Sequence, residues 1–165
     1  MAGRKAIGIG VAALTALAAS VAFAQQQRLS FGSGGGQWSG EYTCSQGLTG
    51  MIVELRPQRG DEVDATVTFF AHPRNPGVES GCYNAHGTID RATGRLVLRP
   101  TRWIFKPGEG WSMTSLDGRV DATGGFNGRV VFAGNPGACT TFALRRNARP
   151  LKAPPIQCVT QAPMS

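Results

Sequence analysis

The sequence predicts an all-β protein: a single eight-stranded antiparallel up-and-down barrel, or a closely related β-sandwich, stabilised by disulfides. Apolar and polar side chains alternate with a period of two through most of the chain, which is typical of strands with one buried face. The clearest segment is EVDATVTFFA, 62–71, in which Val63, Ala65 and Val67 would face the core and Asp64 the solvent. Beyond the signal-like N-terminus no window has an apolar stripe of helical period, and 23 glycines and 10 prolines supply turns.

The alternating segments and the turns between them define eight expected strands. In chain order these are 38–44, 49–57, 62–71, 82–90, 95–100, 111–121, 126–133 and 139–146. If consecutive strands pair, the three tight turns, at 58–61, 91–94 and 122–125, lie at one end of the barrel. The longer connections, at 45–48, 72–81, 101–110 and 134–138, lie at the opposite end. We call that opposite end the mouth and expect binding there, because long loops on a rigid scaffold are where function concentrates.

Two of the tight turns share one pattern, in which an apolar residue precedes Asp and Thr-Gly follows. The segments are TIDRATGRLVL at 88–98 and RVDATGGFNGRV at 119–130. An Asp side chain accepts hydrogen bonds from the backbone two residues ahead, and Gly tolerates the left-handed conformation of a tight turn. We therefore interpret Asp90 and Asp121 as turn formers rather than as a pair of reactive carboxylates.

The N-terminus has the features of a cleaved signal peptide. Arg4 and Lys5 precede an apolar run, and Ala22 and Ala24 form the small-x-small cleavage pattern. The run is too short to span a bilayer, so we expect no membrane span. The expected organisation is a signal peptide at 1–24, a Gly/Gln-rich flexible leader at 25–36, the barrel at 37–147 and a Pro-rich tail at 148–165. The protein is therefore expected to be periplasmic or secreted.

The chain is basic, with 17 Lys and Arg against 10 Asp and Glu. Loss of Arg4 and Lys5 with the signal peptide would leave a net charge of about +5. Attraction to an anionic polymer or lipid surface is one interpretation. Because no run of sequence concentrates the arginines, we favour the interpretation that they are scattered over solvent-facing positions. We expect no nucleic-acid partner for an exported chain.

Four cysteines, Cys44, Cys82, Cys139 and Cys158, predict two disulfides in an oxidising compartment, with three possible pairings. The first three lie at strand ends at the mouth, and Cys158 lies in the tail. Alternation places Cys44 on the inward face and both Cys82 and Cys139 on the outward face. This favours Cys82–Cys139 with Cys44–Cys158, although side-chain direction is loose at strand ends.

No established catalytic motif is present, so we expect a non-enzymatic protein without a metal or cofactor. A thiol nucleophile would need a nearby base, and the candidates are His72 on a mouth loop and outward-facing His86. The cysteines lack the close spacing of a zinc site. A hydrolase is the alternative, but Glu41 and Glu54 occupy solvent-facing strand positions and form no acid–base pair.

We expect a monomeric binding module whose mouth engages a protein or a cell-envelope glycan. Aromatic, basic and amide side chains of the mouth are the candidates: Gln46, His72, Arg74, Asn75, Trp103, Lys106 and Trp111. Trp103 or Trp111 could instead cap the barrel core. The alternative function is a carrier of a small apolar ligand inside the barrel. Its pocket would be formed by Phe69, Tyr83, Val130, Phe132 and Phe142, which could equally fill an empty core.

Several segments resemble a bacterial exported domain found in stand-alone secreted proteins and beside caspase-like peptidases. They are WSGEYTCSQGLTG at 38–50, SGCY at 80–83, GTIDRATGRL at 87–96, WIFKP at 103–107 and GACTTFALRR at 137–146. This resemblance implies a module and names no reaction. GQW at 36–38 is similar to the G-x-W opening of lipocalin-type barrels, which implies that Trp38 closes one end of the barrel. The Tyr42-x-Cys44 pattern is also similar to small periplasmic lysozyme inhibitors.

Overall fold

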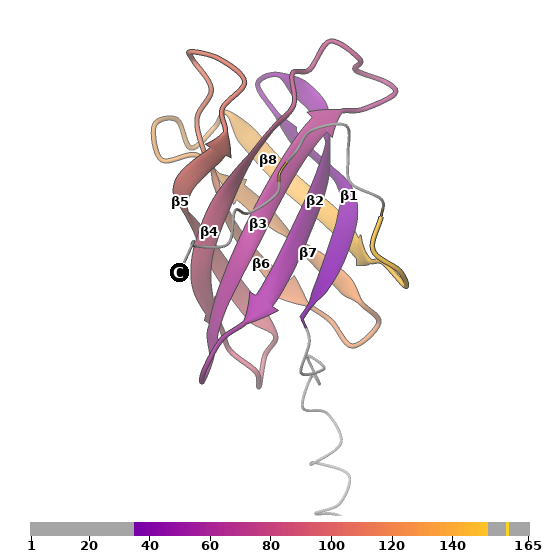
Figure 1. The fold of residues 1–165 in the computed structure, drawn as a ribbon, viewed down its shortest axis with the longest axis vertical. Coiled ribbons are helices and arrows are strands. Elements are labelled where there is room, and N and C mark those ends of the chain that lie inside the picture. Colours follow the sequence, from indigo (N-terminus) through magenta and orange to yellow (C-terminus); the bar gives the residue numbers. More distant parts are fainter. Residues whose placement is uncertain (1–34, 152–157, 159–165) are drawn as a thin grey trace, which may run out of the picture.

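The computed structural model describes residues 35–151 and 158, and within them the chain forms a closed eight-stranded barrel (Figure 1). The strands are β1 Gly36–Cys44, β2 Gly47–Pro57, β3 Glu62–Ala71, β4 Gly81–Ile89, β5 Arg95–Phe105, β6 Ser115–Val120, β7 Gly125–Val131 and β8 Cys139–Arg146. Each strand pairs antiparallel with the next, and β8 pairs with β1 to close the sheet. Closure leaves no open sheet edge. The predicted all-β barrel is therefore confirmed.

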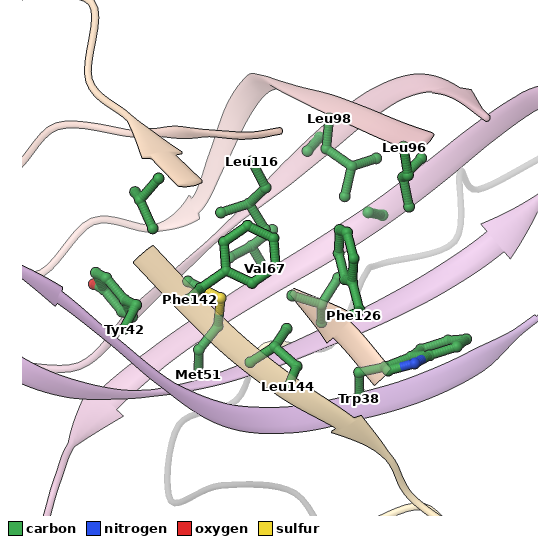
Figure 2. Close-up of a cluster of buried hydrophobic side chains, with 14 of the residues drawn as sticks. Trp38, Tyr42, Met51, Val67, Leu96, Leu98, Leu116, Phe126, Phe142 and Leu144 are labelled. Atoms are coloured by element: carbon green, nitrogen blue, oxygen red, sulfur yellow. The ribbon is translucent and has the colours of Figure 1, made fainter. Parts of the chain in front are cut away.

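The core is formed by the inward side chains of every strand, as the alternation predicts. Trp38, Phe126 and Phe142 are among the largest fully buried side chains, and Met51 and several leucines fill the space between them. Figure 2 shows Trp38 and Tyr42 at opposite ends of this cluster. Trp38 lies near the tight-turn end, with the Arg146 guanidinium 5.4 Å from its ring. The barrel interior is thus packed with side chains over most of its length.

The two Thr-Gly turns form as their sequences predict. Asp90 Oδ1 accepts hydrogen bonds from the backbone N–H groups of Ala92 at 2.8 Å and Thr93 at 3.2 Å. Asp121 Oδ1 accepts an equivalent bond of 2.8 Å from the N–H of Thr123. Hydrogen bonds to each carboxylate lower the pKa of both aspartates, and the bond from the threonine hydroxyl of the same turn has the largest effect. The interpretation of Asp90 and Asp121 as turn formers is confirmed.

Two strand boundaries at the mouth differ from the sequence prediction. β5 continues to Phe105 rather than ending near 100, because Trp103 and Phe105 still pair with β4 across two irregularities in the register. β6 begins at Ser115 rather than at 111. Trp103 therefore belongs to a strand, and the β5–β6 connection is the segment 106–114.

The favoured cysteine pairing is wrong, and the structure contains Cys44–Cys139 and Cys82–Cys158 instead. Cys44 and Cys139 are direct partners in the β1–β8 register, beside a bulge in β1. Alternation fails at the start of β8, because Thr140 and Thr141 are both exposed while Cys139 is buried. Cys139 therefore faces the core and meets inward-facing Cys44, which leaves Cys82 to bind Cys158.

The expected signal peptide at 1–24 and nearly all of the leader at 25–36 lie outside the described residues, as does most of the tail at 148–165. Within the described part, the chain after β8 returns to β1, where the backbone N–H of Leu151 donates to Gln37 Oε1 at 2.8 Å. In the segments that are described, no helix has the length and apolar character needed to cross a membrane. Disulfides form and persist in oxidising compartments, which the two bonds here indicate for this protein.

Candidate functional site

A cavity of about 120 Å³ lies inside the mouth of the barrel. Three connections surround it: the β1–β2 turn, the β5–β6 segment 106–114 and the β7–β8 segment 132–138. Figure 1 shows these longer connections at the top, opposite the tight turns. Its lining residues are Tyr42, Cys44, Ser45, Gln46, Met51, Val67, Phe69, Tyr83, Gly110, Trp111, Ser112, Thr114, Phe132, Ala138 and Cys139. We call this the mouth pocket; exposed Ser45, Gly110 and Ser112 place its rim at the solvent.

One wall of the mouth pocket is polar and belongs to β1, β2 and the turn between them. Gln46 Nε2 donates to the Tyr42 hydroxyl at 3.0 Å and to Thr49 Oγ1 at 3.4 Å. Thr49 in turn donates to the carbonyl of Gly47 at 3.1 Å. Burial is the main cause that raises the pKa of Tyr42 well above its usual value. The phenol is therefore neutral at physiological pH and offers a hydroxyl at the end of the barrel core.

A second buried phenol, that of Tyr83, belongs to β4. Its hydroxyl donates to the backbone carbonyl of Thr114 at 2.9 Å and lies 3.1 Å from Thr114 Oγ1. Burial raises the pKa of Tyr83 to about 12, and the two bonds to Thr114 oppose that rise. These bonds fix the end of the β5–β6 segment against the barrel. The mouth pocket thus has one buried tyrosine on each of two sides.

The apolar wall is a cluster of aromatic rings. Trp111 stacks on Phe69 with the ring centroids 4.9 Å apart and the planes 19° from parallel. Trp103 packs edge-on against both Phe69, at 6.2 Å, and Tyr83, at 5.6 Å. Trp111 Nε1 donates to Glu79 Oε2 at 2.6 Å, which holds the indole in place from the neighbouring loop. Both tryptophans pack against the core, so the capping interpretation is confirmed, and Trp111 in addition lines the mouth pocket.

The β3–β4 loop, residues 72–80, supports the β1–β2 turn from outside the mouth pocket. Asn75 Nδ2 donates to the carbonyls of Gln46 at 2.8 Å and Leu48 at 3.1 Å. His72 and Arg74 contact the Glu41 carboxylate at 3.2 Å and 3.6 Å. Asn75 therefore positions the turn that carries Gln46, whereas His72 and Arg74 bind Glu41. None of the three lines the cavity, and His72 meets a carboxylate rather than a thiol.

The structure brings together only part of the predicted mouth site. Gln46 and Trp111 line the mouth pocket, and Asn75 holds the turn that carries Gln46. Trp103 packs behind the cavity wall, while Lys106 lies outside and forms an ion pair with Glu109 at 3.3 Å. The four cysteines are all in disulfides, and the Cys44–Cys139 bond lies in the pocket wall.

The sequence analysis names Tyr83 as a pocket residue, but it missed the other polar residues inside the mouth, Tyr42, Thr49 and Thr114. Alternation does place Tyr42 and Tyr83 on inward positions close to the mouth ends of their strands. A phenol at an inward position near the end of a strand is a usable signal, because its hydroxyl needs a polar partner when buried. Thr114 had no such signal, since it follows a segment without regular structure.

Among residues 35–151 and Cys158, no three His, Cys, Asp or Glu side chains gather in a way that could hold a metal ion. His86 forms ion pairs with Glu62 and Asp64, but this group lies on the outer wall, far along β3 and β4 from the mouth.

A scan against protein-family models and a search of curated proteins both gave no match for this chain. The class of protein is therefore defined by its fold alone, a closed up-and-down β-barrel with a small pocket in its mouth.

Proposed function

We propose that the protein is a non-enzymatic binding module of an exported chain, which holds a ring-sized group of a protein or cell-envelope glycan in the mouth pocket. The observation that carries the proposal is the combination of a cavity open at its rim, two buried tyrosine hydroxyls and a stacked indole wall. Ligand sites commonly combine apolar walls with a few fixed polar groups that set orientation.

The volume of the mouth pocket limits the size of the group that it accepts. At about 120 Å³ it is slightly smaller than the roughly 150 Å³ cavity that holds one benzene ring. A single sugar ring inserted in part, an acetamido group or one amino-acid side chain fits that volume. The rest of the partner would lie on the rim, where Ser45, Gln46 and Ser112 offer hydrogen-bonding groups.

The carrier hypothesis has less support from the interior of the barrel. Of its five proposed residues, Val130 and Phe142 are fully packed within the core, and Phe142 lies edge-on to Phe126 at 4.8 Å. Only Phe69, Tyr83 and Phe132 border the cavity. A whole apolar ligand would need more space than the mouth pocket provides.

Saturation-transfer NMR with small probes tests the proposal. The probes are N-acetylglucosamine, galactose, and the blocked amino acids N-acetyl-tryptophan amide and N-acetyl-leucine amide, each presented to the full chain. We expect at least one probe to receive saturation, Ser112→Trp to abolish it by filling the cavity, and Lys106→Gln outside the cavity to leave it unchanged. The proposal fails if none of the probes receives saturation, or if Ser112→Trp binds as the parent does.

A further inference from the structure

Charge is divided unevenly between the two halves of the barrel wall. Residues 35–94, which form β1 to β4, contain seven carboxylates and four arginines. Residues 95–146, which form β5 to β8, contain eight basic side chains and three carboxylates. Figure 1 shows β2, β3 and β4 in front of β6, β7 and β8, so the two charge excesses lie on different sides of the molecule.

The arginines that the sequence scatters along the chain converge on the outer face of β5–β8. Five of them alternate with buried inward neighbours on these strands and are exposed: Arg95, Arg99, Arg119, Arg129 and Arg145. The register sets Arg95 directly beside Arg119, and sets Arg129 beside Asp117. We call these five residues the cationic face.

Within the described part of the chain, three carboxylates lie near the cationic face: Asp117, and Asp90 and Asp121, whose pKa values the charges of Arg119 and Arg145 help to lower. Arg95 forms a two-point pair with Asp117, with N···O distances of 3.2 Å and 2.9 Å. Arg145 donates to the hydroxyl of Thr123 at 3.4 Å and forms no ion pair within the described residues. Among the residues described, Arg99, Arg119 and Arg129 form no ion pair with a carboxylate. Three guanidinium groups therefore point into solvent with their donors available.

We propose that the cationic face binds an acidic polysaccharide through the carboxylate, sulfate or phosphate groups of successive sugars. A guanidinium presents planar paired donors that match such anions, and seven of the eight basic residues in this half are arginine. Neighbouring strands are about 4.8 Å apart and alternate residues on one strand about 6.8 Å apart. Arg95 and Arg119 are therefore one strand spacing apart, so that a single anionic chain can contact both.

The side chains between the arginines favour a polysaccharide over other anionic partners. They are short, polar at Ser115, Asn127 and Thr141 and aliphatic at Val97, Val131 and Ala143, and no aromatic ring faces outward among them. The centre of a protein interface is enriched in aromatic side chains, and single-stranded nucleic acid would need rings for base stacking. A barrel wall is also convex, so a planar lipid surface would touch only a narrow strip of it.

The proposal is independent of the mouth pocket, because the two surfaces share no residue. Its variants are therefore chosen on strands β5–β7, where the substituted side chains are exposed and unpaired. The test variant is Arg99→Gln/Arg119→Gln/Arg129→Gln. The matched control is Arg56→Gln/Arg59→Gln/Arg91→Gln, which removes the same number of charges from the other half of the barrel and leaves the mouth loops unchanged.

Isothermal titration of the full chain with heparin and polygalacturonate oligosaccharides is the decisive experiment, because the two probes separate sulfate from carboxylate recognition. We expect binding that weakens as salt rises, because exposed charges are screened within about 8 Å at physiological ionic strength. The test variant should lose about tenfold or more in affinity and the control less than about threefold. Ser112→Trp should bind as the parent does.

Four outcomes would overturn the proposal. The first is no heat of binding to either oligosaccharide at low salt. The second is an equal loss in the test variant and the control, which would mean that net charge alone attracts the polymer. The third and fourth are tighter binding to vesicles of anionic lipid, or to single-stranded DNA, than to both oligosaccharides.

Discussion

Cys44 of the first strand and Cys139 of the last are direct partners in the sheet and are joined by a disulfide at the seam where the barrel closes. The bond therefore reinforces covalently the one strand pairing that links the two ends of the barrel sequence. Both sulfur-bearing residues are buried, and both lie in the wall of the mouth pocket. Barrel closure and pocket shape thus depend on the same contact.

Removal of this bond by Cys44→Ala/Cys139→Ala is expected to lower the free energy of unfolding by about 4 kcal/mol. The sequence separation is 95 residues, and a cross-link of that span restricts the unfolded chain strongly in the chain-entropy account. Urea denaturation of the variant and the parent measures the change. Cys82→Ala/Cys158→Ala is the comparison: its span of 76 residues gives nearly the same chain-entropy effect, so any greater loss at Cys44–Cys139 measures what covalent closure of the barrel adds. A larger loss in that comparison would contradict the role assigned to the seam.

Gly40→Ala is expected to lower the free energy of unfolding by about 2–3 kcal/mol. Gly40 occupies an inward position of β1, and a Cβ there would meet the backbone carbonyl oxygen of Ala143 on β8 at 2.0 Å. The two strands would have to separate to accommodate a methyl group. Thermal and urea denaturation provide the measurement. Gly77→Ala is the control, since nothing lies within 4 Å of its Cβ position; equal stability of the two variants would contradict the prediction.

The sequence predicts the barrel well because alternation and turn chemistry are local. Val63, Ala65 and Val67 all face the core, and both Thr-Gly turns form through bonds within a few residues. The cysteine pairing is not predicted, because a bulge near Cys44 and the two consecutive exposed threonines before Phe142 break the alternation on which the prediction depended. A single residue of slippage at a strand end reverses the face of a side chain.

The candidate site is predicted only in part, because it depends on contacts between distant segments. The sequence predicts that Gln46 lies at the mouth, but it does not reveal that Gln46 bonds to the Tyr42 hydroxyl. The cavity exists because Trp111 folds back onto Phe69 and bonds to Glu79, and an irregular loop conformation has no periodic signal. The cationic face likewise arises from register across four strands, which no linear run of arginines reveals.

His86 is expected to make the protein more stable at mildly acidic than at mildly alkaline pH. Its ring lies 2.8 Å from Asp64 and 2.5 Å from Glu62. The hydrogen bond to Asp64 and the charge of Glu62 raise the pKa of His86, and Arg99 is its neighbour on β5. Since the folded pKa is raised, the stabilisation is full below the unfolded pKa, about 6.5, and is lost as pH rises through the folded pKa. The imidazole is exposed, so the effect is below about 1 kcal/mol.

Urea denaturation at several pH values across that range, for the parent and for His86→Gln, checks this dependence. The variant should lack the fall in stability that the parent shows as the imidazole loses its proton. NMR titration of the imidazole should show a midpoint above that of an unfolded histidine. An identical pH profile in parent and variant would show that the two carboxylates contribute nothing to stability.

The two tyrosines of the chain, Tyr42 and Tyr83, are expected to remain protonated in the folded protein at pH values that ionise an exposed phenol. Burial raises both pKa values, that of Tyr83 to about 12, whereas an unfolded tyrosine titrates near 10. The folded state therefore holds more protons than the unfolded state above pH ~10, and stability falls as the pH rises from there.

Tyrosinate absorbance measures ionisation directly, and the protein unfolded in guanidinium is the control. We expect little tyrosinate at pH ~10.5 while near-ultraviolet circular dichroism remains native, and full ionisation to accompany unfolding. A midpoint near 10 in the folded protein would mean that the mouth pocket is open enough for water to solvate both phenolates, which would contradict the narrow cavity on which the binding proposal rests.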